Sequence, residues 1–196
     1  MAVIQEPFGV TRGGQAVEKF ILRCGWLEAE VLTYGAALRV LRAPDRNGEP
    51  VDVVLGYDNV AGYESGGCYI GAVVGRYANR IAGAGCVIDG RRVPLEANEG
   101  TKQLHGGPRG FSHRVFEGRK AGENAVALTY TAADGEGGFP GTLALQVTYT
   151  LSERAIAIRY EAACDKATYC NITNHSYFNL NGGGDVMGHR LWLSAR

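Results

Sequence analysis

Apolar and polar residues alternate with a period of two along much of the chain. Three neighbouring segments carry an apolar residue at every second position: Val126, Leu128 and Tyr130; Leu143, Leu145, Val147, Tyr149 and Leu151; Ile156, Ile158 and Tyr160. Successive side chains of a strand point to opposite faces of a sheet, so each segment presents one apolar face. The pattern predicts an antiparallel meander with one buried face.

The remaining segments also favour strands over helices. Short apolar runs interrupted by Gly25 and Gly35 fill residues 19–44, and VDVVLGY (51–57) is typical of a strand. Asp89-Gly90 stands between apolar flanks and predicts a hairpin turn, because both residues tolerate positive φ. ADGEGGFPG (133–141) has the composition of a loop.

We therefore expect an all-β chain with two packed antiparallel sheets, an antiparallel β-sandwich that forms one domain over residues 1–196. The sequence ends in HRLWLSAR, where Leu191, Trp192 and Leu193 resemble the opening of a further strand. This pattern leads us to expect that the sandwich is incomplete at its C-terminal end.

Composition and charge limit the classes of partner that the chain is expected to bind. The 20 basic and 20 acidic residues balance, so we expect neither nucleic acid nor membrane as a partner. No basic start followed by an apolar run opens the chain, which favours a cytoplasmic location. The five cysteines are odd in number and form no CxxC pair, so we expect reduced, mostly buried thiols.

Three polar clusters stand out as candidates for chemistry. His105 lies in QLHGGPRGF, where Gly106 and Gly107 would let backbone approach a ligand closely. His175 lies in TNHSYFNLNG (173–182), whose polar residues converge beside two aromatic ones. The third cluster, GAVVGRYANRIAGAG (71–85), contains the polar residues Arg76, Asn79 and Arg80.

The third cluster has two readings. One buried arginine often ties one sheet to another, whereas several polar groups together suit a polyhydroxylated ligand. His113 and His189 lack comparable surroundings and are interpreted as structural or surface residues. No GxSxG nucleophile elbow and no nucleotide-binding glycine loop is present, and no HxH or HExxH pair predicts a metal site.

In this order, GRYANRIAG, LHGG followed by GF, and TNHSYFNL resemble the aldose 1-epimerases, also called galactose mutarotases. The DGEGGFPG loop and the VIDG hairpin fit the same family, and the resemblance covers essentially the whole chain. It implies a galactose mutarotase-like supersandwich that interconverts the α and β anomers of free aldoses such as galactose and glucose. It also implies no metal or organic cofactor, an aldose as the small-molecule partner, and a monomer or homodimer.

The resemblance assigns roles to five residues. Asn79 and Arg80 correspond to sugar-binding residues, and His105 to the histidine that contacts sugar oxygens near the reacting centre. His175 corresponds to the general acid, and Tyr177 lines the sugar site. Ring opening needs a base at the C1 hydroxyl and an acid at the ring oxygen, and a histidine with an ordinary pKa of about 6.5 suits the acid.

The sequence departs from the family pattern at its C-terminal side. The family's general base, a glutamate, and a sugar-binding aspartate lie farther downstream than residue 196. We therefore expect an N-terminal portion of a mutarotase with little or no activity by itself. Asp185 is the carboxylate nearest to His175 in sequence, but its glycine-rich setting is typical of a loop.

Two alternatives stay open. One is a non-catalytic sugar-binding module on the same fold, which would bind galactose without accelerating its mutarotation. The other is an isomerase of hexose 6-phosphates, which would need additional cationic groups for the phosphate. A purely structural sandwich fits the three polar clusters poorly.

Overall fold

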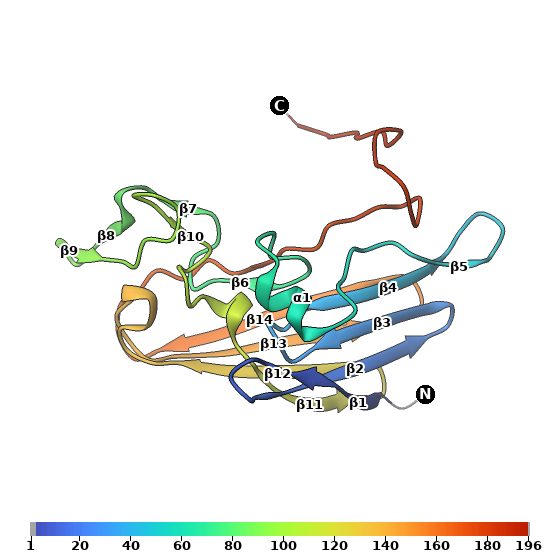
Figure 1. Ribbon diagram of the computed structural model, residues 1–196, viewed down its shortest axis with the longest axis horizontal. Coiled ribbons are helices and arrows are strands. Elements are labelled where there is room, and N and C mark those ends of the chain that lie inside the picture. Colours follow the sequence, from blue (N-terminus) through green and yellow to red (C-terminus); the bar gives the residue numbers. More distant parts are fainter. Residues whose placement is uncertain (1–2, 196) are drawn as a thin grey trace.

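The computed structural model describes residues 3–195, and antiparallel strands dominate it (Figure 1). The first sheet has five strands in sequential order: β1 (Ile4–Val10), β2 (Ala16–Cys24), β3 (Leu27–Leu32), β4 (Leu38–Pro44) and β5 (Pro50–Asp52). The predicted breaks at Gly25 and Gly35 both fall between strands, where each glycine has a positive φ.

The second sheet is the predicted meander. It contains β11 (Glu117–Gly122), β12 (Ala125–Ala132), β13 (Leu143–Leu151) and β14 (Ile156–Cys164), again in sequential antiparallel order. The five large apolar residues of β13 are buried, and the intervening ones, Ala144 included, are more exposed. The period of two therefore indicated both the strand and its inward face correctly.

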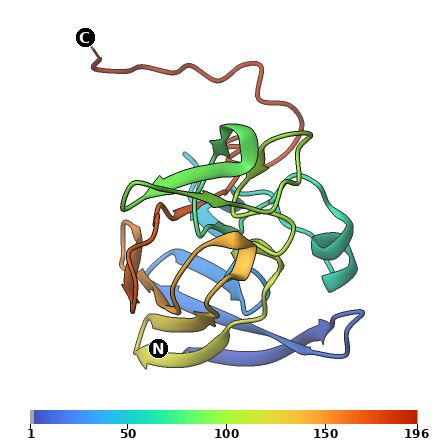
Figure 2. The ribbon, with the colours of Figure 1, turned by 90° about the vertical axis from the view of Figure 1, so that its left-hand side faces the viewer.

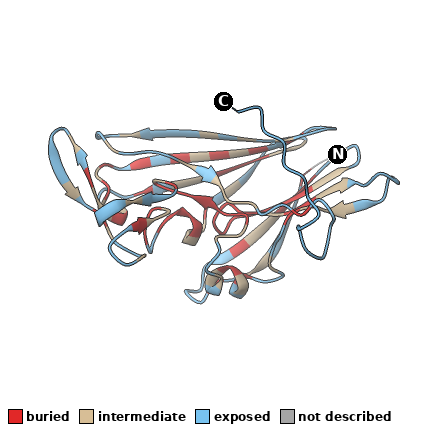
Figure 3. Ribbon diagram, turned by 90° about the horizontal axis from the view of Figure 1, so that it is seen from above, coloured by how far each residue is buried: buried red, intermediate tan, exposed pale blue. Residues whose placement is uncertain are grey.

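The two sheets pack face to face, which confirms the expected sandwich (Figure 2). Phe20 and Leu22 from β2 meet Leu128, Val147 and Tyr149 from the second sheet in one continuous core. Figure 3 shows the buried residues concentrated along these strands and along the chain segments that cross them. Burial of this apolar area is the main stabilising contribution to the fold.

Shorter elements lie outside the two main sheets. They are helix α1 (Val60–Ser65), the pairs β6 (Val73–Val74) with β15 (Thr173–Asn174) and β7 (Arg80–Ile81) with β10 (Gln103–Leu104), the hairpin of β8 (Gly85–Ile88) and β9 (Arg91–Pro94), and three single-turn 3₁₀ helices, η1 (Ala82–Ala84), η2 (Phe111–His113) and η3 (Glu136–Gly138). The predicted Asp89-Gly90 turn joins β8 to β9, with φ of 51° and 75°. The predicted loop 133–141 contains η3 as its one regular turn.

Two expected strands differ from the structure. The strand predicted over 51–57 ends at Asp52, and Val54 instead forms an isolated bridge with Phe178, because the chain turns there to pair with a later segment. Residues 191–193 form no strand and are exposed, since no neighbouring strand hydrogen-bonds to them.

The cysteine prediction holds only in part. All five cysteines lie among the described residues and none forms a disulfide. Cys86 is buried, however, while Cys68 and Cys170 are exposed. The expectation of mostly buried thiols was wrong, because both exposed cysteines lie in irregular segments outside the core.

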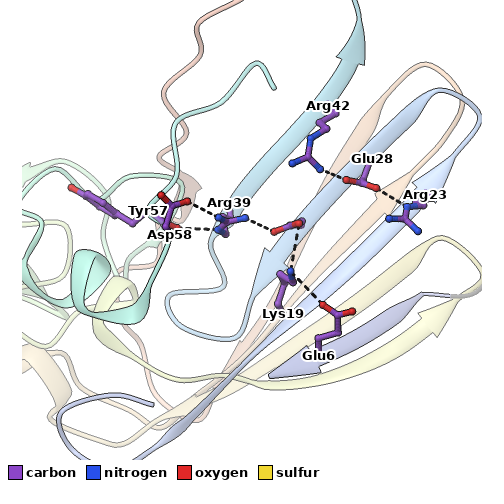
Figure 4. Close-up of polar contacts among 9 residues, drawn as sticks. Glu6, Lys19, Arg23, Glu28, Arg39, Arg42, Tyr57 and Asp58 are labelled. Atoms are coloured by element: carbon purple, nitrogen blue, oxygen red, sulfur yellow. Dashed lines mark hydrogen bonds and ion pairs between the residues drawn. The ribbon is translucent and has the colours of Figure 1, made fainter. Parts of the chain in front are cut away.

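Arg39 on β4 connects the first sheet to the segment before α1 (Figure 4). Its guanidinium donates to the Glu30 carboxylate on β3 at 2.6 Å, to Asp58 at 2.9 Å and to the Tyr57 carbonyl at 2.9 Å. Lys19 lies 3.6 Å from the same Glu30 carboxylate. Glu30 is 6% exposed, so these two cations must offset the cost of burying its carboxylate.

Replacing Arg39 by Ala should therefore lower the free energy of unfolding by about 3 kcal/mol, because the buried Glu30 carboxylate loses its closest partner. The matched control is Arg23→Ala. Arg23 pairs with Glu28 at 2.6 Å but is about half exposed, so its loss should cost less than about 1 kcal/mol. Urea denaturation measures both, and equal losses would show that Arg39 has no special role.

Candidate active site

His175 is held in place by its backbone. The segment that carries it pairs with β6 through β15, and beyond the pairing the His175 amide donates to the Ala72 carbonyl at 2.8 Å. The His175 carbonyl in turn accepts from the Gly71 amide at 3.1 Å. Farther along, the Asn179 amide donates to the Val53 carbonyl at 2.9 Å. The segment is thus fixed on both sides of the histidine.

Asn174, the residue before His175, connects the site to the core. Its carboxamide donates to the Gly71 carbonyl at 2.8 Å and lies 3.3 Å from the hydroxyl of the fully buried Tyr149. Tyr149 donates to the Ala36 carbonyl at 2.7 Å. Part of the polar character of this segment therefore serves to anchor it to the sandwich.

The environment of His105 determines its tautomer. The Asn79 amide donates to Nδ1 of His105 at 3.0 Å, and the His105 amide donates to the Asn79 carbonyl at 3.1 Å. A ring nitrogen that accepts a hydrogen bond carries no proton, so we assign the proton of the neutral ring to Nε2.

Burial also keeps His105 neutral. Burial is the largest cause, and together with the nearby His175 and Arg80 it lowers the pKa of this imidazole to about 4, although Glu99 acts in the opposite direction. At neutral pH His105 is therefore a hydrogen-bond donor through Nε2. It is poorly suited to exchange protons there.

The structure brings the predicted histidines together. The ring centroids of His105 and His175 are 5.0 Å apart in an edge-to-face arrangement. The ring of Tyr177, which is 41% exposed, lies 5.3 Å from the ring of His175, centroid to centroid. The main polar groups predicted to surround a sugar thus converge from segments far apart in the sequence.

Arg80 and Asn79 lie beside His105, but both are already engaged. The Arg80 guanidinium forms two hydrogen bonds of 2.6 Å with the Glu99 carboxylate, and this pairing lowers the pKa of Glu99. The side-chain oxygen of Asn79 accepts from the Arg80 amide at 2.9 Å, while its own backbone occupies the left-handed region. The Asn79 side-chain nitrogen and the unpaired edge of Arg80 remain for a ligand.

Arg76 matches the structural interpretation of its cluster, in which a buried arginine ties two parts of the fold together. It is 3% exposed and donates to the Pro140 and Gly141 carbonyls, each at 2.9 Å, so it ties β6 to the 133–141 loop. Gly106 likewise has a structural role. A Cβ there would lie 1.8 Å from the Gly75 carbonyl oxygen, so the close approach is to protein backbone and not to a ligand.

Asp185 and His189 lie apart from this arrangement, whereas the ring centroid of His113 is 6.1 Å from that of Tyr69, which packs beside His105. The Asp185 carboxylate accepts from the Met187 amide at 3.0 Å in an exposed loop, as its sequence setting indicated. His189 accepts from the Leu180 amide at 3.1 Å and is exposed. His113 is half-buried, and burial lowers its pKa.

One residue at the centre of the site was missed from the sequence. The Tyr69 ring lies 4.7 Å from His105 and 5.9 Å from His175. The available signal was its position two residues before the glycine-rich run that starts at Gly71. Such proximity in sequence does not show which face an aromatic ring will cover.

Within residues 3–195, no three His, Cys, Asp or Glu side chains gather in a way that could hold a metal ion. No helix in this part of the chain is long and apolar enough to cross a membrane.

The sequence profile of the aldose 1-epimerase family matches residues 20–196. The chain belongs to this family. It is 40% identical to galactose mutarotase of Rattus norvegicus over its whole length, and 45% identical to aldose 1-epimerase of Haemophilus influenzae over 74% of its length. The match covers 58% of the rat protein and 43% of the bacterial one, so the chain spans about half the length of these relatives.

A solved structure of an aldose epimerase homologue from C. elegans has the same fold. It superposes with a TM-score of 0.78 at 35% identity, over 84% of this chain and 52% of that chain. Family and structure together confirm the expected mutarotase-like β-sandwich.

The low pKa of His105 predicts a pH dependence of stability. The unfolded state binds a proton at His105 near pH 6.5 and the folded state only near pH 4, so folding is favoured fully above pH 6.5 and loses stability as the pH falls from 6.5 to 4. His105→Asn, which tolerates the left-handed φ of 53°, should reduce this slope by up to one proton. Urea denaturation from pH 4 to 7 measures it, and an unchanged slope would contradict the assignment.

Proposed function

We propose that these residues form the N-terminal part of a single mutarotase domain, and that the whole protein is an aldose 1-epimerase acting on free aldohexoses such as galactose and glucose. The observation that carries the proposal is the edge-to-face pair of His105 and His175, in which Nδ1 of His105 accepts from the Asn79 amide.

The two histidines divide the chemistry between them. His175 gives its proton to the ring oxygen as the C1–O5 bond opens, and takes it back when the ring recloses on the other face of the aldehyde. His105 donates from Nε2 to a sugar oxygen and stabilises the negative charge that develops there. Asn79, Arg80 and Tyr177 hold the sugar in register with both rings.

The C1 hydroxyl must also lose its proton to a base. Glu99 is a poor candidate, because its hydrogen bonds to Arg80 lower the pKa of its carboxyl group. We propose that the base is a carboxylate from sequence beyond residue 196, as the family resemblance implies. Residues 1–196 by themselves should then bind an aldose weakly and catalyse little.

Within residues 3–195, the arginine beside the two histidines is Arg80, whose guanidinium pairs with Glu99, so this part of the chain does not favour the hexose-phosphate alternative. Cytoplasmic location and a monomeric or dimeric state stay predictions. A non-catalytic sugar-binding module is an outcome of the experiment below.

Polarimetry on freshly dissolved α-galactose tests the proposal. The purified 196-residue chain should leave the spontaneous rate unchanged. A chimera, in which residues 1–196 replace the aligned part of the rat galactose mutarotase, should accelerate mutarotation. If the 196-residue chain accelerated mutarotation, the proposal that the base lies beyond residue 196 would be wrong. A folded chimera that binds galactose without accelerating mutarotation would favour the non-catalytic module.

His175→Asn in that chimera should lower kcat by about 100-fold or more, because the ring oxygen loses its proton donor. His189→Asn is the matched control, since its imidazole is exposed and lies outside the site. An unchanged kcat in the His175→Asn chimera would show that this histidine is not the proton donor.

A further inference from the structure

The ring of Tyr69 packs beside both histidines, and the three rings form a triangle. Its ring meets His105 edge-to-face, with the centroids 4.7 Å apart and the planes at 74°. The same ring lies 5.9 Å from His175 and is tilted by 47° to it. Aromatic rings at these separations attract each other in defined orientations, so a half-buried Tyr69 restricts how both imidazoles can turn.

The backbone of Tyr69 is held in an unfavourable conformation. Its φ is 55°, in the left-handed region that bulky side chains rarely occupy. Asn79 and His105 share this feature, with φ of 66° and 53°. Three residues with a left-handed backbone therefore meet at one site, and the bulky Tyr69 is the one whose conformation the surrounding structure must enforce.

The turn that begins at Tyr69 also holds the backbone of His175. The Tyr69 carbonyl accepts from the Ala72 amide at 3.1 Å, and Gly71 and Ala72 exchange hydrogen bonds with His175. Gly71 is required in this turn, because a Cβ there would lie 2.2 Å from the Leu38 carbonyl oxygen. One short turn thus fixes the His175 backbone through residues 71 and 72, and the imidazoles through the ring of Tyr69.

We propose that Tyr69 is a positioning residue, whose ring sets the relative orientation of His105 and His175 and keeps water away from His105. Its catalytic meaning rests on the proposed function, whereas the ring contacts can be tested without any sugar. The groups facing His105 are His175 after β15, Arg80 on β7, Glu99 in the loop before β10, and Tyr69 itself.

The test is an NMR titration of His105 in the ligand-free 196-residue chain. Tyr69→Leu removes the ring but keeps a Cβ at the strained position, so water should reach the imidazole and the pKa of His105 should rise by about one. Tyr69→Phe keeps the ring and should leave the titration within about 0.3 of the wild-type midpoint. The matched control is Tyr160→Leu, a half-buried tyrosine on β14 that packs against the main core and should leave His105 unchanged.

Two results would overturn the proposal. One is a pKa of His105 in Tyr69→Leu that equals the wild-type pKa, and the other is a pKa of His105 in Tyr69→Phe that rises as much as in Tyr69→Leu. If the leucine variant does not fold, the unsubstituted chain still decides, since nuclear Overhauser effects must connect the Tyr69 ring to the His105 ring. Their absence would refute the contact. Failure of the proposed function would look different: the polarimetric assays would fail while the His105 titration still responded to Tyr69→Leu.

Discussion

The hydrogen bond from the Asn79 amide to Nδ1 of His105 determines what this site can do. This hydrogen bond places the proton of the neutral ring on Nε2. Protonation of Nδ1 would break the hydrogen bond. Burial acts in the same direction, because a cationic imidazole is costly away from water. One backbone amide therefore makes His105 a hydrogen-bond donor through Nε2.

The sandwich provides the rigidity that this arrangement requires. Asn174 reaches the buried Tyr149 hydroxyl, so the segment that carries His175 is tied to the core between the two sheets. Asn79 directly precedes β7 and His105 directly follows β10, so the pairing of these two strands brings the two left-handed residues together.

The sequence predicted the parts of the molecule that local pattern controls. The five apolar residues of β13 and the Asp89-Gly90 turn needed only their neighbours to be interpreted. His105 and His175 could be identified through family motifs, and the structure brings them within 5.0 Å of each other. Their roles as sugar-contacting residues remain proposals.

The features that the sequence left open or missed share a physical cause. Arg76 ties a loop, Gly106 packs against Gly75, and the ring of Tyr69 packs beside two histidines, and in each case the partner comes from a distant segment. A residue's type constrains what it can contact, but the tertiary pairing decides what lies opposite. The exposed cysteines show the same point, since apolar character by itself did not determine their burial.

Long-range ¹H–¹⁵N correlation NMR on the 196-residue chain at pH 7 tests the central claim most directly, because it distinguishes the protonated from the unprotonated ring nitrogen. The account predicts that His105 is neutral, with its proton on Nε2 and a bare Nδ1. A proton on Nδ1, or a cationic ring at this pH, would contradict it.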